Sequence, residues 1–368
     1  MKLRIAIVAA CPYPVPQGSQ VLLRTTAQAV QRRGHEVHLV VYGYGAGEDD
    51  GTLPVHRCRS IPGMRRTLAG PSWGKPLADV ALVATLRRVT REQSIDIVHA
   101  HNYEGLIAAL AVRKRPIVYH AHNAMADELP HFLRGGRIAG RWLDTTFPRR
   151  ADRIIAMHDR LADYLVQCGC NPSRVSVIPP CVDADQFEIG EVSDCIPPVL
   201  YTGNLDVYQN LPLLLRAVAR VRSAIPQVTL RIGSADSTVI PETEMIPIPD
   251  FDTLRKALRE DAVFVSPRVS WSGYPIKLLN AMAACKPIVA CASASPCLVH
   301  EQNGLIVPDN DEAAMAEAII RLLRDPELRA RLGRNARQTV ETRFDAGTLA
   351  ERIEEVYRAA LTSGDSQS

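Results

Sequence analysis

The chain has 368 residues, of which 46% are hydrophobic, 23% charged and 5% aromatic, with a formal net charge of +3 at pH 7. This length fits two domains of roughly 150–200 residues each. The small net charge argues against a nucleic-acid partner recognised by a broad basic surface. No apolar run approaches the length of a transmembrane helix, about 18 residues.

The amino terminus and the cysteines indicate a cytoplasmic protein. The first apolar run, residues 5–10, is short and leads into a Cys-Pro-Tyr-Pro loop, which is typical of a buried strand rather than of a signal peptide. The cysteines show no C-x-x-C spacing and match no zinc pattern, so we expect free thiols in a reducing compartment.

The first half of the chain alternates short apolar runs with longer helical patterns, as parallel α/β units do. The apolar runs are nearly continuous, which indicates strands that are covered on both faces. Gly34 ends the first helix as a left-handed cap. The predicted strands are 3–9, 36–42, 95–99, 117–120 and 153–157, and the predicted helices are 19–33, 78–92, 105–113 and 160–167.

Proline-rich segments at 177–183 and 193–198 predict an interdomain linker. The α/β pattern then restarts, which predicts two doubly wound parallel sheets in tandem. A long final helical region and a small polar tail at 362–368 close the chain. The predicted strands of this half are 199–202, 228–232, 262–265 and 287–290, and the predicted helices are 211–223, 251–259, 275–284 and 311–324.

Open parallel sheets bind ligands beyond the carboxyl ends of their strands. The first such loop, residues 12–20, places Gly18 before a helix whose free amides favour an anion, although a plain turn explains Gly18 equally well. The loop is not G-x-G-x-x-G, and no acidic residue ends the second strand. Both observations argue against a nicotinamide oxidoreductase.

Two predicted strands end in matching histidine pairs, His99-Ala-His101-Asn102 and His120-Ala-His122-Asn123. Strand alternation puts the two histidines of each pair on one side of the sheet. A single metal would need all four rings to converge, and no Asp, Glu or Cys follows at ligand spacing, so we predict no metal site. We expect His122 in a catalytic pocket, where its ring donates hydrogen bonds after modest pKa tuning; a buried structural role is the alternative.

The segment 266–284 carries the features of an anion site. It follows a buried strand, turns at Gly273 and starts a helix at Pro275, a favoured first helical position. Lys277 and Asn280 are three residues apart and therefore share a helix face. Loop amides, the helix start and Lys277 predict a diphosphate site, and Arg268 just upstream favours it over a solvated lysine.

The sequence resembles glycosyltransferase family 4, a large retaining family with the GT-B fold, in an ordered set of motifs. The resemblance covers nearly the whole chain. The matching segments are the Pro/Gly loop after the first strand, Gly-His-Glu-Val at 34–37, Asp-Ile-Val-His-Ala-His at 96–101, Ala-Asp-Arg-Ile-Ile-Ala at 151–156, Val-Ile-Pro-Pro-Cys-Val-Asp at 177–183, Gly-Tyr-Pro-Ile at 273–276, Ala-Met-Ala-Ala-Cys-Lys-Pro-Ile-Val-Ala at 281–290 and Asn-Gly-Leu-Ile-Val at 303–307.

The resemblance implies two Rossmann-like domains that face each other across a cleft. Residues 1–182 would bind the acceptor, a helix at about 346–361 would pack back on them, and residues 183–345 would bind the donor. It further implies a nucleoside diphosphate sugar as donor, a hydroxyl acceptor that is lipid-linked or a small molecule, and retention by front-side attack. Neither a cofactor nor a metal is expected.

The chain departs from the family pattern at four positions. Ser272 and Asn280 stand where the family has two glutamates, and Asn204 and Gln209 stand where it has an arginine and a lysine. We expect Arg268 and Lys277 to neutralise the departing diphosphate instead, as catalytic residues together with His122. The donor-binding residues implied are Gly18, Asn204, Ser272, Gly273, Tyr274, Pro275, Ile276 and Asn280, and His101, Asn102 and Asn123 are assigned to the acceptor or pocket.

Asn280 would meet the ribose, while Ser272 and the amides after it would face the donor sugar. Residues near Asp206, Tyr208 and 246–251 are expected to abut the base. Three D-x-D sequences, at 183–185, 250–252 and 309–311, lie at turns or helix starts, so we predict that they are caps rather than metal ligands.

The segment 129–150 mixes basic and bulky apolar residues, which predicts contact with an anionic membrane surface at the inner face; a solvated face is the alternative. Its double glycine predicts a weak helix. Two rival functions stay open: a sugar-nucleotide-binding pseudoenzyme that has lost transfer with its glutamates, and a GT-B phosphorylase or epimerase.

Overall fold

The computed structural model describes residues 2–14, 18–45, 51–60, 74–191, 193, 195–236 and 238–364. The chain forms two compact units. Unit 1 comprises Met1–Pro180, Ser272–Tyr274 and Ala346–Ser368, and unit 2 comprises Cys181–Trp271 and Pro275–Asp345. Each unit is built on its own parallel sheet.

The sheet of unit 1 has the strand order β3-β2-β1-β4-β5-β6-β7, and every pairing among its described strands is parallel. Its central strands are almost wholly buried, because helices cover both faces. The strands are β1 Arg4–Ala9, β2 Glu36–Val41, β3 Val55–Arg57, β4 Ile97–His101, β5 Ile117–Ala121, β6 Arg153–Ala156 and β7 Val175–Val177.

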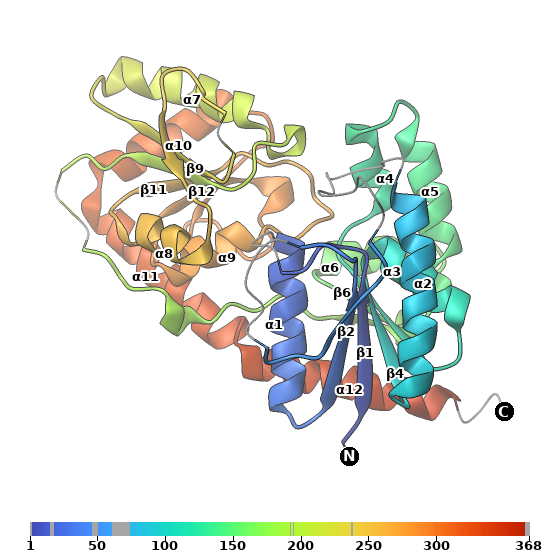
Figure 1. The fold of residues 1–368 in the computed structure, drawn as a ribbon. Helices are drawn as coiled ribbons and strands as arrows, with labels where there is room; N and C mark the ends of the chain where they lie inside the picture. The colour runs from blue at the N-terminus through green and yellow to red at the C-terminus, as the bar shows by residue number, and fades with distance from the viewer. Residues whose placement is uncertain are drawn as a thin grey trace. The chain divides into compact units, whose positions relative to one another are not determined.

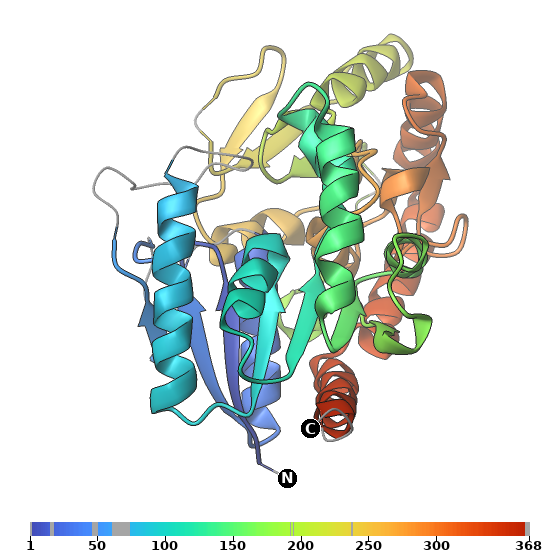
Figure 2. The ribbon, with the colours of Figure 1, turned by 90° about the vertical axis from the view of Figure 1, so that its right-hand side faces the viewer.

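On one face of this sheet α2 packs against α3, and on the other α1 packs against α12 (Figures 1 and 2). The last helix, α12, also contacts β5 and β6. The helices of unit 1 are α1 Gly18–Arg32, α2 Lys75–Glu92, α3 Asn102–Val112, α4 Met125–Glu128, α5 Gly136–Thr146, α6 Asp159–Gln167 and α12 Ala346–Gly364, with short 3-10 turns at Leu129–His131, Pro148–Arg150 and Pro172–Arg174.

The sheet of unit 2 has the order β10-β9-β8-β11-β12-β13, again parallel among the described strands. Its core unites the sheet with α7 and α10. The strands are β8 Val199–Thr202, β9 Leu230–Ser234, β10 Glu244–Pro247, β11 Val263–Ser266, β12 Ile288–Cys291 and β13 Leu305–Val307, and the helices are α7 Leu211–Ala224, α8 Phe251–Arg259, α9 Ile276–Ala283, α10 Glu312–Arg324 and α11 Pro326–Arg343, with 3-10 turns at Ala184–Gln186, Val207–Gln209 and Ala292–Ala294.

The predicted fold class, two doubly wound Rossmann-like sheets, is confirmed. All nine predicted strands are present within two residues of their expected bounds. The sequence analysis missed the edge strands β3, β7, β10 and β13, which have only three or four residues each. β3, β7 and β10 are partly buried or exposed and lack a continuous apolar run, whereas β13 is apolar and mostly buried but only three residues long. The cysteines are all free, as expected.

Both sheets reverse direction beside their first strand. In unit 1 the chain builds β2 and β3 on one side of β1 and then β4 on the other; in unit 2 it builds β9 and β10 beside β8 and then β11. The carboxyl ends of β1 and β4, and those of β8 and β11, are therefore topological switch points, where α/β proteins bind ligands.

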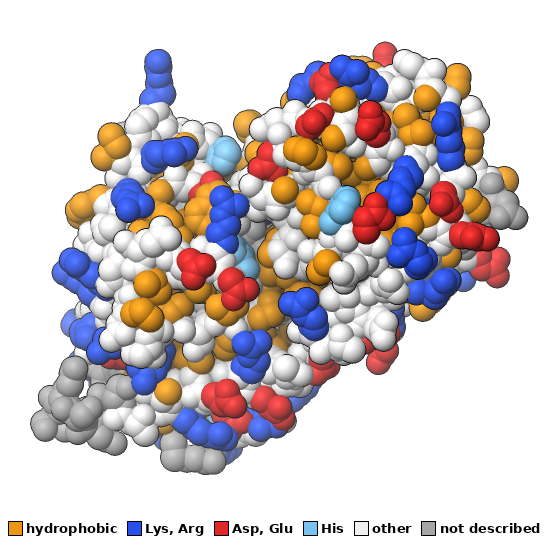
Figure 3. Space-filling model, turned by 180° about the vertical axis from the view of Figure 1, so that it is seen from behind, with side chains coloured by type: hydrophobic (Ala, Val, Ile, Leu, Met, Phe, Trp, Pro, Cys, Tyr) orange, Lys and Arg blue, Asp and Glu red, His pale blue; other side chains and the backbone are white. Residues whose placement is uncertain are grey.

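No helix in the described part of the chain is long and apolar enough to cross a membrane. On the face drawn in Figure 3, side chains of both charges are interspersed and no broad basic field is visible, in keeping with the small net charge.

Candidate active site

The switch point of unit 2 brings together two loops from neighbouring strands. β8 and β11 pair in parallel, so the chain leaves both at the same edge of the sheet, at Gly203 and Pro267. Gly203 has a φ of +138°, a conformation that L side chains rarely adopt. A Cβ there would lie 3.3 Å from Tyr201 Oη, which is a tight contact, and 3.7 Å from Lys277 Nζ, which is an ordinary van der Waals distance.

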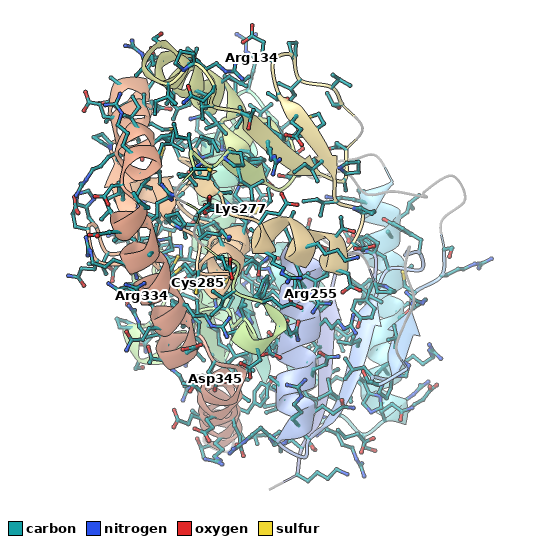
Figure 4. All side chains as sticks on the ribbon, turned by 90° about the vertical axis from the view of Figure 1, so that its left-hand side faces the viewer. Arg134, Arg255, Lys277, Cys285, Arg334 and Asp345 are labelled. Atoms are coloured by element: carbon teal, nitrogen blue, oxygen red, sulfur yellow. The ribbon has the colours of Figure 1, made fainter. Side chains whose placement is uncertain are left out.

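Lys277 comes from the first turn of α9 (Figure 4). Its Nζ donates to Gln209 Oε1 at 2.5 Å and lies 4.2 Å from the centroid of the Tyr201 ring, within range of a cation–π contact. Burial, and then the nearby Arg268, lower the pKa of Lys277 well below its ordinary value. No ion pair among the described residues involves Lys277, so the ammonium has amide and aromatic neighbours but no counterion.

The two residues that replace the family's cations form one network with this lysine. Gln209 Nε2 donates to Asn204 Oδ1 at 2.6 Å, and Asn204 Nδ2 donates to Asp206 Oδ2 at 2.6 Å and to Tyr208 Oη at 2.8 Å. Gln209 is therefore the link between Lys277 and Asn204. The ammonium of Lys277 lies directly against the position where the family pattern has a lysine.

The guanidinium of Arg268, from the loop after β11, lies beside the same network of Asn204, Tyr208 and Gln209. It lies 5.3 Å from the centroid of the Tyr208 ring, and its Nε donates to Ser270 O at 3.0 Å. The network includes one carboxylate, that of Asp206. Its pKa is raised above the ordinary value, first by burial and then by the nearby Asp236. Both cations belong to the connection from β11 into α9, with Arg268 in the loop and Lys277 in the first turn of the helix. Two cations placed in this way suit an anion with several oxygens.

The helix start differs slightly from the prediction. Pro275 is the N-cap residue, and α9 begins at Ile276. Asn280 lies one turn after Lys277, is half-buried, and makes no side-chain hydrogen bond within the described ranges. Its amide is therefore available to a ligand, and the contact with a ribose stays a prediction.

The predicted turn residues Ser272–Tyr274 group with unit 1, apart from their neighbours in the chain. Ser272 is buried, and its backbone N and Oγ donate to Asp127 Oδ2 at 3.2 and 2.9 Å. Its hydroxyl is therefore already engaged by a carboxylate. The sequence carried no signal for Asp127, which lies in α4, 145 residues away.

The switch point of unit 1 carries the histidines, and all four rings converge. β4 and β5 pair with His101 opposite His120. His101 Nδ1 lies 3.0 Å from His122 Nε2, and His99 Nδ1 lies 2.7 Å from Tyr357 Oη on α12. Burial lowers the pKa of His99 and of His122 to about 3, a much larger shift than the modest tuning expected. His122 is therefore a neutral hydrogen-bonding ring at neutral pH.

The remaining predicted residues of unit 1 lie at the same edge of its sheet. Asn102 begins α3 with a left-handed φ of 61°, and Asn123 follows His122 and is half-buried. Gly18 is the first residue of α1, and residues 15–17 of its loop lie outside the described ranges.

The predicted caps are confirmed in all three D-x-D sequences. Asp183 accepts from Asp185 N, Asp250 accepts from Thr253 N, and Asp311 accepts from Ala313 N and Ala314 N. These carboxylates thus satisfy free amides at helix starts.

The segment 129–150 contains a regular helix, α5, and the double glycine lies at its start, with Gly135 as the N-cap and Gly136 as the first residue. Gly136 and Gly140 face inward, where an added Cβ would lie 2.6 Å from Leu129 O and 2.3 Å from Met125 O. The glycines therefore allow close packing of α5. Its outer face exposes Ile138 and Trp142, with 80% and 59% of their surface accessible.

Comparison with known proteins identifies related sequences over both units. Residues 16–186 match the family described as glycosyltransferase family 4, and residues 196–325 match that described as glycosyl transferases group 1. The chain is 25% identical to a D-inositol 3-phosphate glycosyltransferase of Kineococcus radiotolerans, over 97% of this chain and 95% of that protein. It is 26% identical to a phosphatidyl-myo-inositol mannosyltransferase of Mycobacterium leprae, over 98% of both chains.

Among solved structures, HepE of Anabaena in complex with UDP-glucose superimposes with a TM-score of 0.73 at 19% identity, over 97% of this chain and 100% of that chain. The likeness shows a shared fold.

Proposed function

We propose that this chain, which belongs to glycosyltransferase family 4, moves a sugar from a nucleoside diphosphate sugar to a hydroxyl acceptor with retention of configuration. The observation that carries the proposal is the ammonium of Lys277, which lies against Gln209 without a carboxylate partner among the described residues. A cation held in this way at a switch point is arranged for an anion, and a sugar nucleotide supplies its diphosphate.

The donor is proposed to bind with its diphosphate between Arg268 and Lys277. Negative charge develops on the diphosphate as the glycosidic bond breaks, so two cations stabilise the transition state more than the ground state. Binding an anion would also reverse the lowered pKa of Lys277, because an opposite charge favours the protonated form. Asn280 is assigned to the ribose and the Gly273 and Tyr274 amides to the donor sugar.

Retention is proposed to proceed by attack on the face from which the diphosphate leaves. The chain lacks both glutamates of the family pattern, at Ser272 and Asn280. The departing diphosphate is then the base that accepts the proton of the acceptor hydroxyl. His122 is proposed to hold a sugar hydroxyl through the ring nitrogen that His101 does not occupy.

No metal is proposed for the transfer step, since Arg268 and Lys277 provide the positive charge. The affinity for a nucleoside diphosphate should therefore be the same with and without Mg²⁺. A tenfold or larger gain on adding Mg²⁺ would show that the two side chains do not neutralise the donor by themselves.

The acceptor is proposed to be a phosphorylated polyol, either free or carried by a lipid. Both relatives named above are described by an inositol that bears a phosphate, once as D-inositol 3-phosphate and once as phosphatidyl-myo-inositol. Turnover with inositol phosphates and with phosphatidylinositol vesicles separates the two forms of acceptor.

Peripheral membrane contact through residues 129–150 is part of this proposal. The exposed Ile138 and Trp142 would enter the lipid boundary. The same segment leads into Arg149 and Arg150, which line a hollow of about 410 Å³ together with Arg113 and Arg174. Arginines beside an exposed apolar face suit anionic headgroups. Trp142→Ala should reduce co-sedimentation with anionic vesicles, and unchanged co-sedimentation would refute the contact.

The donor assignment is tested by thermal unfolding with UDP, GDP, TDP, ADP and NAD. A ligand at 100 times its dissociation constant stabilises the fold by about 2.7 kcal/mol, which gives a clear shift. We expect one nucleoside diphosphate to give this shift, Lys277→Gln to lose it and Lys256→Gln to keep it. Lys256 is an exposed lysine of the same unit, so it controls for the change in net charge.

Two other outcomes separate the rival functions. A shift without donor hydrolysis or transfer to any acceptor would favour a sugar-nucleotide-binding pseudoenzyme. Donor consumption with phosphate or water alone would favour a phosphorylase or an epimerase. No shift with any nucleotide would overturn the donor site.

A further inference from the structure

A group of three histidine rings lies wholly inside unit 1. His99 and His101 project from β4, and His120 projects from the adjacent position of β5. Each has 0% of its surface exposed. The ring centroids of His99 and His101 are 4.6 Å apart, those of His101 and His120 are 4.7 Å apart, and those of His99 and His120 are 5.3 Å apart.

Most ring nitrogens of this group have no hydrogen-bond partner among the described residues. They are Nε2 of His99, Nε2 of His101 and both nitrogens of His120. A buried polar atom that is left unsatisfied costs about 1–3 kcal/mol. Four such atoms in one buried cluster therefore indicate that a bound species completes the site.

The other ring nitrogens are arranged as metal-binding histidines require. A ligating imidazole usually donates its second N–H to a fixed acceptor, which sets the tautomer. His99 Nδ1 lies 2.7 Å from Tyr357 Oη, and His101 Nδ1 lies 3.0 Å from His122 Nε2. When each Nδ1 carries the proton and donates it, each Nε2 presents a free electron pair.

The charge state also fits. Burial lowers the pKa of His99 to about 3 and holds those of His101 and His120 well below their ordinary value. Burial thus disfavours the protonated form of the rings, and the uncharged imidazole is the form that binds metal.

The distances are close to those of a bound ion. One ring nitrogen from each histidine lies within 4.8 Å of those of the other two. Bonds of 2.0–2.1 Å in a tetrahedral site place the ligand nitrogens about 3.4 Å apart. Ring rotations that bring the nitrogens together by up to about 1.4 Å would close the site around an ion.

We propose that His99, His101 and His120 bind one divalent transition-metal ion, with zinc as the expected occupant. Three imidazoles without a carboxylate suit zinc and its neighbours and exclude magnesium and calcium. A water molecule takes the fourth position. The ion joins β4 to β5 and, through Tyr357, secures α12 against the sheet. It lies in unit 1 and takes no part in neutralising the donor diphosphate in unit 2.

The test is cobalt binding to the full chain after dialysis against EDTA. Tetrahedral Co²⁺ absorbs strongly in the visible region, and zinc should abolish this absorption by displacement. We expect one Co²⁺ per chain. His120→Gln should weaken binding at least tenfold. His56→Gln should leave it unchanged, because His56 belongs to a separate histidine pair in which its Nε2 lies 3.0 Å from His38 Nδ1.

Metal analysis of the untreated protein covers the case in which the buried site exchanges slowly. Protein produced in zinc-supplemented medium should carry about one zinc per chain, with X-ray absorption showing three nitrogen ligands. Circular dichroism shows whether His120→Gln is folded, and His99→Gln serves as a second variant. A natively folded wild-type chain without stoichiometric metal from either route overturns the proposal. So does binding that survives in both variants or is lost in His56→Gln.

Discussion

Because Lys277 and Gln209 are in contact, we predict that the ammonium proposed to bind the donor can be exchanged between these two positions. In the double variant Gln209→Lys/Lys277→Gln, the ammonium and the amide exchange places. Their polar atoms are 2.5 Å apart, so the charge moves by only a few ångströms and returns to the position where the family pattern has its lysine. A diphosphate bound beside positions 209 and 277 should still contact the ammonium after the exchange.

The two single variants give the expected size of the losses in nucleotide affinity and in stability. Lys277→Gln removes one charge-assisted hydrogen bond, about 1.5–3 kcal/mol, so the affinity for a nucleoside diphosphate should fall roughly 10- to 150-fold. Gln209→Lys places a second ammonium about 4 Å from the first, and the repulsion is about 4 kcal/mol at an effective dielectric constant of 20. The ligand-free protein should therefore melt earlier, while the diphosphate relieves the repulsion when it binds.

The double variant should regain most of both losses. We expect nucleotide affinity within about tenfold of the wild type and a ligand-free melting temperature above that of Gln209→Lys. Calorimetric titration with the nucleoside diphosphate that stabilises the wild type measures the affinity, and the four proteins form a double-mutant cycle. A double variant that binds no better than Lys277→Gln would show that the two positions do not share one anion site.

Four further predictions concern stability. Asp144→Asn should cost about 2–3 kcal/mol in urea unfolding, because the buried carboxylate accepts from the amides of Met125 and Ala126 and from a tyrosine hydroxyl. Arg329→Met should cost about 3 kcal/mol, because the fully buried guanidinium donates to three backbone carbonyls that would lose their partner. Gly140→Ala should lower the melting temperature without changing nucleotide affinity, since the added Cβ would lie 2.3 Å from Met125 O in unit 1 and the donor cations belong to unit 2. In metal-free protein, acid should unfold unit 1: burial holds the pKa of the four clustered histidines far below the unfolded value of about 6.5, so the unfolded chain takes up about four more protons as the pH falls through 6.5. The loss should be about 2 kcal/mol per ring at pH 5, and urea unfolding that is unchanged between pH 7.5 and 5 would contradict it.

The central part of the fold could be predicted from the sequence because its strands are buried on both faces. β1, β4 and β5 are wholly or almost wholly buried, and a nearly continuous apolar run records that burial directly. The edge strand β3 has only partly buried or exposed residues, and its pairing depends on β2, so its own three residues carry no recognisable pattern.

The helix α5 depends on packing that the sequence does not show. Glycine lowers intrinsic helix propensity by up to about 1 kcal/mol per residue, so Gly135 and Gly136 predicted a weakened helix. Tertiary packing outweighs that cost here: Gly136 and Gly140 let the helix approach the backbone of residues 125 and 129. A propensity scale contains no term for this contact.

The composition of the candidate site was predictable, but its connections were not. The positions of Asn204, Gln209, Arg268 and Lys277 follow from the motifs and from the carboxyl ends of strands. The bond between Gln209 and Lys277 joins residues 68 positions apart, and it depends on the pairing of β8 with β11. Tyr201, whose ring lies beside the ammonium, gave no sign in the sequence beyond being an aromatic residue near a strand end.

The same bond bears on whether the unusual residues mark a lost or a relocated site. Random loss of the family's cations would leave no reason for a lysine to be brought to the vacated position. Here Lys277 Nζ donates to Gln209 and lies beside the ring of Tyr201. Burial and Arg268 lower the pKa of Lys277, so they disfavour its protonated form in the ligand-free protein. A bound anion would favour that form again, and on this ground we propose a working donor site rather than a decayed one.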